Sequence, residues 1–87
     1  MNDRPMRKQN IAWRKIAGEA VIIDLDRDRQ FHELNEVGSL IWELCDGKKS
    51  IPEIEDKVCD FFDVEKNVAT QDVLEFLTDL KEKQLLT

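Results

Sequence analysis

The sequence has few of the residues from which enzyme sites are usually built. It contains three glycines, two cysteines and one histidine in 87 residues. Gly18, Gly38 and Gly47 are too widely spaced for a glycine-rich phosphate-binding loop, and no HExxH or GxSxG motif occurs. We therefore expect a protein that is not an enzyme.

The single histidine and the two cysteines do not suggest a catalytic or metal site. His32 would be the first candidate for acid–base catalysis or metal binding, but nothing places a serine or cysteine beside it. A structural or binding role in a strand is the preferred interpretation. Cys45 and Cys59 have no CxxC partner, which favours free buried thiols over a disulfide. We expect neither a metal nor another cofactor.

Long apolar runs are absent as well. The longest, Ala20 to Ile23, is far shorter than the roughly 20 residues that span a bilayer. The N-terminus, MNDRPMRKQN, carries charge but no apolar signal core. We expect a cytoplasmic protein with no membrane partner.

Acidic residues outnumber basic ones, 19 to 13, which gives a net charge of −6. Binding to a phosphate backbone relies on Lys and Arg, so this balance disfavours nucleic acid as the main partner. At 41% hydrophobic and 37% charged residues, the chain has the composition of a single globular domain. We expect a flexible tail over residues 1–10 and the domain over residues 11–87.

The first half of the domain alternates in the manner of strands. Three strands are predicted, over Ile11 to Ala17, Ala20 to Asp26 and Gln30 to Leu34, and the second, the most apolar, should be central. Its Val21, Ile23 and Leu25 share one face, with Ile22 opposite. The third strand is short and polar, so we expect it at the edge of an antiparallel sheet with unpaired N–H and C=O groups.

The second half has helical periodicity. The three expected N-caps are Asn35, Ser50 with a capping box to Glu53, and Thr70 after a loop from Asp63 to Ala69. Gly47 is expected to close the first helix. The expected apolar stripes are Val37, Leu40, Ile41, Leu44 and Cys45; Ile51, Ile54, Val58 and Phe61 or Phe62; and Val73, Phe76, Leu77, Leu80 and Gln84. Trp13 and Trp42 are expected in the core.

Three strands followed by three helices predict an α+β fold with a three-stranded antiparallel sheet, similar to a winged helix-turn-helix. A DNA-binding regulator is therefore one alternative. Charge opposes it, because acidic residues outnumber lysines on both later helices. The acidic residues are Glu53, Glu55, Asp56 and Asp60 on one helix and Asp72, Glu75, Asp79 and Glu82 on the other.

Residues along the chain resemble the PqqD-like family. They are Leu34-Asn35, Ile41-Trp42, Cys45-Asp46-Gly47, Ile51 with Glu53-Ile54, and Asp72-Val73 with Phe76-Leu77 and Leu80. The resemblance spans about Ile11 to Leu86. That family includes the peptide chaperone of pyrroloquinoline quinone biosynthesis and the leader-recognition elements of ribosomally made, modified peptides. It implies a leader peptide that docks between the third strand and the last helix.

The mechanism implied by the resemblance is strand addition, in which backbone groups hold the leader and pockets select its side chains. The expected binding residues are Arg29, Gln30, Phe31, His32, Glu33 and Leu34 on the strand, and Asp72, Val73, Phe76, Leu77 and Leu80 on the last helix. Asp72 or Asp79 could meet a Lys or Arg of the leader. For Val73, Leu77 and Leu80, plain core packing is the alternative.

The resemblance also implies a partner enzyme. The favoured type is the standalone recognition protein of lasso-peptide pathways, which works with a separate leader peptidase. The alternative within the family is the quinone-cofactor chaperone, which partners a radical SAM protein. The residues themselves are compatible with both.

Overall fold

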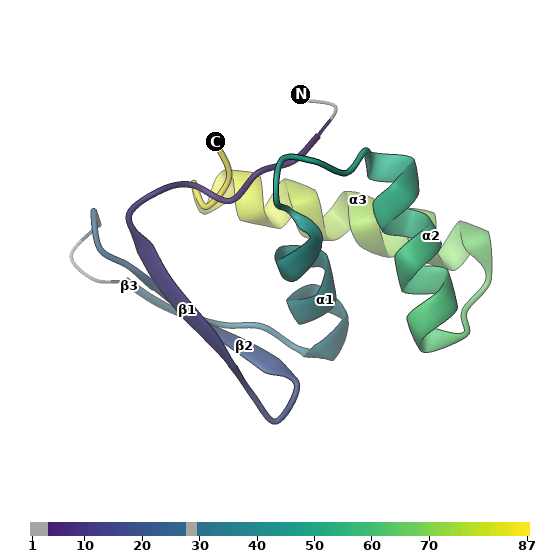
Figure 1. Cartoon of the computed structure of the whole chain (residues 1–87), viewed down its shortest axis with the longest axis horizontal. Helices are drawn as coiled ribbons and strands as arrows, with labels where there is room; N and C mark the ends of the chain where they lie inside the picture. The colour runs from purple at the N-terminus through teal and green to yellow at the C-terminus, as the bar shows by residue number, and fades with distance from the viewer. Residues whose placement is uncertain (1–3, 28–29) are drawn as a thin grey trace.

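The computed structural model describes residues 4–27 and 30–87. Its strands are β1 (Ile11–Ile16), β2 (Glu19–Asp24) and β3 (Gln30–Glu33), and its helices are α1 (Glu36–Leu44), α2 (Ile51–Phe62) and α3 (Lys66–Glu82). The predicted α+β class, with an antiparallel sheet followed by three helices, is confirmed. Figure 1 shows the sheet on one side of the molecule, with α1 between it and α2.

The sheet has the order β1-β2-β3, which confirms the predicted central and edge strands. β1 ends at Ile16 because Ala17 and Gly18 adopt positive φ angles of 54° and 82° in a tight hairpin turn. The face of β2 that packs on the helices carries the fully buried Ala20, Ile22 and Asp24. The more apolar set, Val21, Ile23 and Leu25, points to the outer face of the sheet.

The N-cap of α1 is the predicted one, since the Asn35 side chain accepts a hydrogen bond from the Gly38 amide at 2.8 Å. The end of α1 differs from the prediction. The helix stops at Leu44 with Cys45 as its C-cap. Gly47 does adopt a positive φ, 80°, but in the following turn, where its amide donates to the Pro5 carbonyl.

α2 begins with the predicted capping box between Ser50 and Glu53. Of the two candidate phenylalanines at its end, Phe62 is half-buried while Phe61 is 71% exposed. The predicted start of α3 at Thr70 is wrong, because the helix begins at Lys66 with Glu65 as an N-cap that makes no side-chain bond.

Two predicted positions on α3 differ in the structure because of where the helix begins and ends. Thr70 lies within the helix, and its hydroxyl donates to Glu55 on α2 at 3.1 Å instead of capping. Gln84, predicted on the apolar stripe, follows the end of the helix with a φ of 59° and is exposed. The stripe of α3 therefore ends at Leu80.

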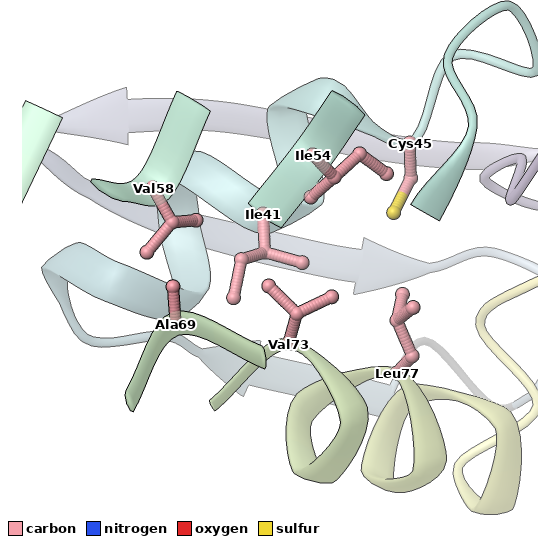
Figure 2. Packing of buried hydrophobic residues seen from close by; sticks show 7 residues of the cluster. All are labelled: Ile41, Cys45, Ile54, Val58, Ala69, Val73 and Leu77. Atoms are coloured by element: carbon pink, nitrogen blue, oxygen red, sulfur yellow. The ribbon is translucent and has the colours of Figure 1, made fainter. Parts of the chain in front are cut away.

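The core consists of two hydrophobic clusters that share α1. One joins the three helices through Ile41, Cys45, Ile54, Val58, Ala69, Val73 and Leu77, whose side chains point toward one another in Figure 2. The other joins the sheet to α1 and the C-terminal end through Ala20, Ile22, Leu34, Trp42, Leu80 and Leu85. Trp13 packs edge-on against the buried Trp42 at 6.0 Å, as expected of core residues.

The N-terminal segment, predicted as a flexible tail, lies between the loop after α1 and the C-terminal end of the chain. The Arg7 amide donates to the Cys45 carbonyl and the Lys8 amide to the Leu85 carbonyl, both at 2.9 Å. The Arg7 guanidinium also donates to the Trp42 and Glu43 carbonyls at 2.8 Å, where a cation complements the C-terminal end of α1. The segment thereby closes one end of the core.

No helix in residues 4–27 and 30–87 is long and apolar enough to cross a membrane.

Candidate functional site

The outer edge of β3 offers unpaired backbone groups. The Leu34 amide donates to the Ala20 carbonyl, and β3 continues the same register with His32 opposite Ile22. Hydrogen bonding alternates along an antiparallel pair, so the backbone of His32 faces β2, whereas the N–H and C=O groups of Phe31 and Glu33 point away from it. Within the described part of the chain, no other strand pairs with this edge. The edge can accept another strand.

β3 lies beside the C-terminal half of α3. In the turn that precedes the strand, the Arg27 side chain donates to the Gln84 side chain just beyond the end of α3, at 2.5 Å. At its end, Leu34 is 6% exposed and packs in the same cluster as Leu80, with Phe76 against that cluster. The open edge is therefore bordered by the helix.

A groove continues from the end of β3 between the first turn of α1 and α3. Its lining residues are Asn35, Val37, Gly38, Asp72, Glu75, Phe76 and Asp79. Phe76 is half-buried and reaches both core clusters, so its ring is held from below. Gly38 has no side chain, which lets this ring lie against the backbone of α1. The groove thus has an aromatic floor next to the open strand.

The predicted site residues separate into three groups in the structure. Gln30, Phe31 and Glu33 are exposed on β3, and Asp72 and Phe76 line the groove. Leu34, Val73, Leu77 and Leu80 are buried in the core, at 6% exposure or less, which fits the core-packing alternative for the three helix residues. Arg29 lies outside the described residues.

His32 takes an intermediate position. Its side chain is half-buried on the inner face of the sheet, on the same side as Leu34. Its Nε2 atom is buried and has no hydrogen-bond partner among the described residues. Nor does the described part of the chain contain a group of three or more His, Cys, Asp or Glu residues that could hold a metal ion.

Four groove residues were not identified from the sequence: Asn35, Val37, Gly38 and Glu75. For one of them, Gly38, the sequence did contain a signal. Glycine inside a helix is about 1 kcal/mol less favourable than alanine, so Gly38 at the third position of α1 indicates a close approach by another part of the chain. The other three are ordinary helix or cap residues whose place in the groove depends on how α1 packs against α3.

Three carboxylates surround the groove, and they differ in their partners. Asp79 forms an ion pair with Lys83 at 2.9 Å, and Glu75 accepts a hydrogen bond from Gln71 at 2.7 Å. Asp72 has no bonded partner among the described residues. No lysine or arginine lines the groove, so the charges of its lining residues are all negative, with that of Asp79 partly offset by Lys83.

Comparison with known proteins is consistent with this geometry. A family model described as Coenzyme PQQ synthesis protein D (PqqD) matches residues 19–86. The structure of TbiB1 in complex with the TbiA(beta) leader peptide is similar with a TM-score of 0.82 and 30% identity, over 93% of each chain. A lasso peptide synthetase B1 complexed with the leader peptide has the same TM-score and 20% identity, over 97% of this chain and 98% of that one. No curated protein gives a match.

Proposed function

Because the chain belongs to the PqqD family, we propose that it binds the leader segment of a ribosomally made precursor peptide and delivers it to a separate modifying enzyme. The observation that carries the proposal is the open edge of β3 bordered by α3 and the groove. The 30% identical TbiB1 holds a leader peptide, which supports the same function here.

Binding proceeds by strand addition. The guest backbone pairs with Phe31 and Glu33, whose N–H and C=O groups point outward, and the guest becomes a fourth strand beside β3. Side chains alternate along that strand. Those on the outer side lie beside Phe31 and Glu33, and those on the inner side lie beside His32 and face α3. The proposed contacts are Gln30, Phe31, His32 and Glu33 on β3, with Asp72 and Phe76 in the groove.

The backbone bonds alone give weak binding. Two residues with outward groups provide two donors and two acceptors, and each bond contributes about 1 kcal/mol net, or about 4 kcal/mol in all. That corresponds to a Kd of about 1 mM at best, because the entropy lost on association weakens it further. Tighter binding and the choice of guest therefore depend on side chains in the groove. Leu34, Val73, Leu77 and Leu80 act indirectly, as the buried layer that supports Phe76.

The chemistry belongs to the partner. Three carboxylates line the groove, and none of its lining residues is a histidine, cysteine, lysine or serine that could act as nucleophile. We favour a lasso-peptide pathway with a separate leader peptidase as the partner enzyme. The alternative is the PqqD-type chaperone of a radical SAM protein. Pull-down of each candidate enzyme with the peptide-loaded chain distinguishes them.

A titration followed by NMR tests peptide binding. The probe is a synthetic leader from a short precursor encoded next to the gene of this chain, and the control is the same peptide with its sequence scrambled. The expected result is saturable shifts in the amides of residues 30–34 and 72–79, with small changes on α2. Saturable shifts confined to other surfaces would contradict the proposed site.

A further inference from the structure

The groove beside β3 combines an apolar floor with an acidic rim. Asp72, Glu75 and Asp79 recur at the three- to four-residue spacing that places side chains on one side of a helix, and Phe76 lies among them. An apolar surface under a ring of like charge is complementary to an aliphatic chain that ends in a cation. Leucine or phenylalanine would use only the floor.

The neighbouring end of α1 offsets this preference only in part. Helix N-termini attract anions through free amide groups. Here the Asn35 side chain already accepts from the Gly38 amide at 2.8 Å, which occupies one of those donors. Asp72 has no bonded partner among the described residues, so its carboxylate needs no rearrangement to meet a guest cation. A guest carboxylate would be repelled by Asp72 and Glu75, whereas the charge of Asp79 is partly offset by Lys83.

Space and position are also suitable. The groove volume is about 260 Å³, several times the ~30 Å³ that one water molecule occupies in the liquid. It begins at Asn35, directly after the paired residues of β3, and so lies beyond one end of the guest strand. The guest residue that enters it is therefore next to the paired segment and on the side facing α3.

We propose that this groove selects a peptide with a lysine or arginine immediately beyond the segment that pairs with β3. The aliphatic stem packs on the Phe76 ring, and the cationic group lies among the carboxylates with Asp72 as its main partner. For arginine, stacking over the ring adds a cation–π contact. The inference rests on the proposed peptide binding and specifies which peptides bind.

A random peptide library displayed on phage identifies the preference without knowledge of the natural guest. The library is selected on the immobilised chain, and enriched peptides are made with a fluorescent label for polarisation measurements. The expected result is a fixed lysine or arginine at one end of the enriched motif. Replacing that residue by glutamine should lower the affinity about five-fold, the upper range for a solvent-accessible ion pair.

A charge exchange assigns the contact to Asp72. Asp72→Asn should lower the affinity for the cationic peptide about five-fold and leave that of the glutamine peptide unchanged. Asp72→Lys should then prefer a peptide with glutamate at the same position. Asp60→Asn is the matched control, because Asp60 is exposed on α2 and its substitution changes the net charge equally.

The possible outcomes distinguish the cation subsite from the proposed peptide binding on which it rests. Two results would contradict the cation subsite but not strand addition. One is an apolar residue at that position in the enriched peptides. The other is a cationic motif whose affinity changes equally with the Asp60 and Asp72 variants. Failure of both library peptides and the synthetic leader to bind would overturn both.

Discussion

A methyl group on Gly38 would lie 2.2 Å from Cε2 and 2.4 Å from Cζ of Phe76. Real carbon atoms do not approach so closely, so the position of the Phe76 ring depends on the absence of a side chain at Gly38. This contact between α1 and α3 forms the floor of the groove. It connects one glycine to the shape of the proposed peptide site.

Gly38→Ala should therefore impair binding more than folding. Alanine gains about 1 kcal/mol as a helix residue, which offsets the ~1 kcal/mol needed to force the ring from its rotamer. We expect a free energy of unfolding within about 1 kcal/mol of wild type and a peptide affinity about ten-fold lower. Urea unfolding and fluorescence polarisation measure the two. In a Phe76→Leu background there is no ring for the new methyl group to meet, so Gly38→Ala should there raise the free energy of unfolding by about 1 kcal/mol, and the absence of that gain would contradict the assigned contact.

Proline substitutions on β3 should distinguish its two edges. Glu33→Pro removes an amide that points outward, so the domain should stay folded while peptide affinity falls at least about ten-fold. Glu33→Thr retains the amide and loses the same charge, so the affinity that Glu33→Pro loses relative to Glu33→Thr measures the backbone donor alone. His32→Pro instead removes the donor to Ile22 on β2 and should destabilise the fold by about 2 kcal/mol. Thermal unfolding and binding curves for the three variants test this assignment; equal effects at positions 32 and 33 would contradict it.

The two cysteines should differ in reactivity. Burial, together with the charge of Asp46, raises the pKa of the Cys45 thiol to about 12 despite the nearby Arg7, so it stays protonated at pH 8. Cys59 is half-buried on α2. A thiol reagent should label Cys59 in the native protein and Cys45 only at the rate of unfolding. The Cys59→Ser variant isolates Cys45, and rapid native labelling of that variant would show that the helical core opens.

The fold should lose stability in acid through Asp24. Burial alone would raise the pKa of this carboxyl, but hydrogen bonds from Lys8 and the Asp26 amide, both at 3.0 Å, hold it below its ordinary value. A lowered folded-state pKa means that the ionised group stabilises the fold above the unfolded pKa, near 4, and that this contribution is lost as the pH falls through the folded-state pKa. Asp24→Asn should thus be less stable than wild type at pH 7.

Urea unfolding at pH 7, 5 and 3 measures this difference. The stability gap between wild type and Asp24→Asn should be similar at pH 7 and 5 and narrower at pH 3, which lies below the unfolded-state pKa, so that the unfolded chain binds a proton more readily than the folded one. Asp60→Asn provides a control of equal formal charge. If the difference in unfolding free energy between wild type and Asp24→Asn is the same at all three pH values, the charge of the Asp24 carboxylate contributes nothing to its interaction with Lys8.

The strands and caps with local signals could be predicted from the sequence. The edge position of β3 followed from its shortness and polarity, and Asn35 and Ser50 cap helices through side chains within three residues of them. The start of α3 was missed because Glu65 makes no side-chain cap and the first turn contributes only a small apolar residue, Ala69, to the buried stripe. Thr70 offered a stronger local signal, but its hydroxyl bonds across to α2.

The groove was only partly predictable for a related reason. Apolar residues on α3 can be recognised by their spacing, but the same spacing describes core and binding surface alike. Val73, Leu77 and Leu80 are buried, whereas Phe76, between them, reaches the groove. Which residue of a stripe remains accessible depends on how far α1 approaches α3, and that distance is set by a contact between residues far apart in sequence.

Site-resolved amide hydrogen exchange on β3, with and without saturating leader peptide, tests strand addition most directly. The account predicts that Phe31 and Glu33, whose amides point outward, become protected on binding, while His32, already bonded to β2, changes little. If the chain is saturated with peptide and the amides of both Phe31 and Glu33 exchange at an unchanged rate, strand addition is contradicted.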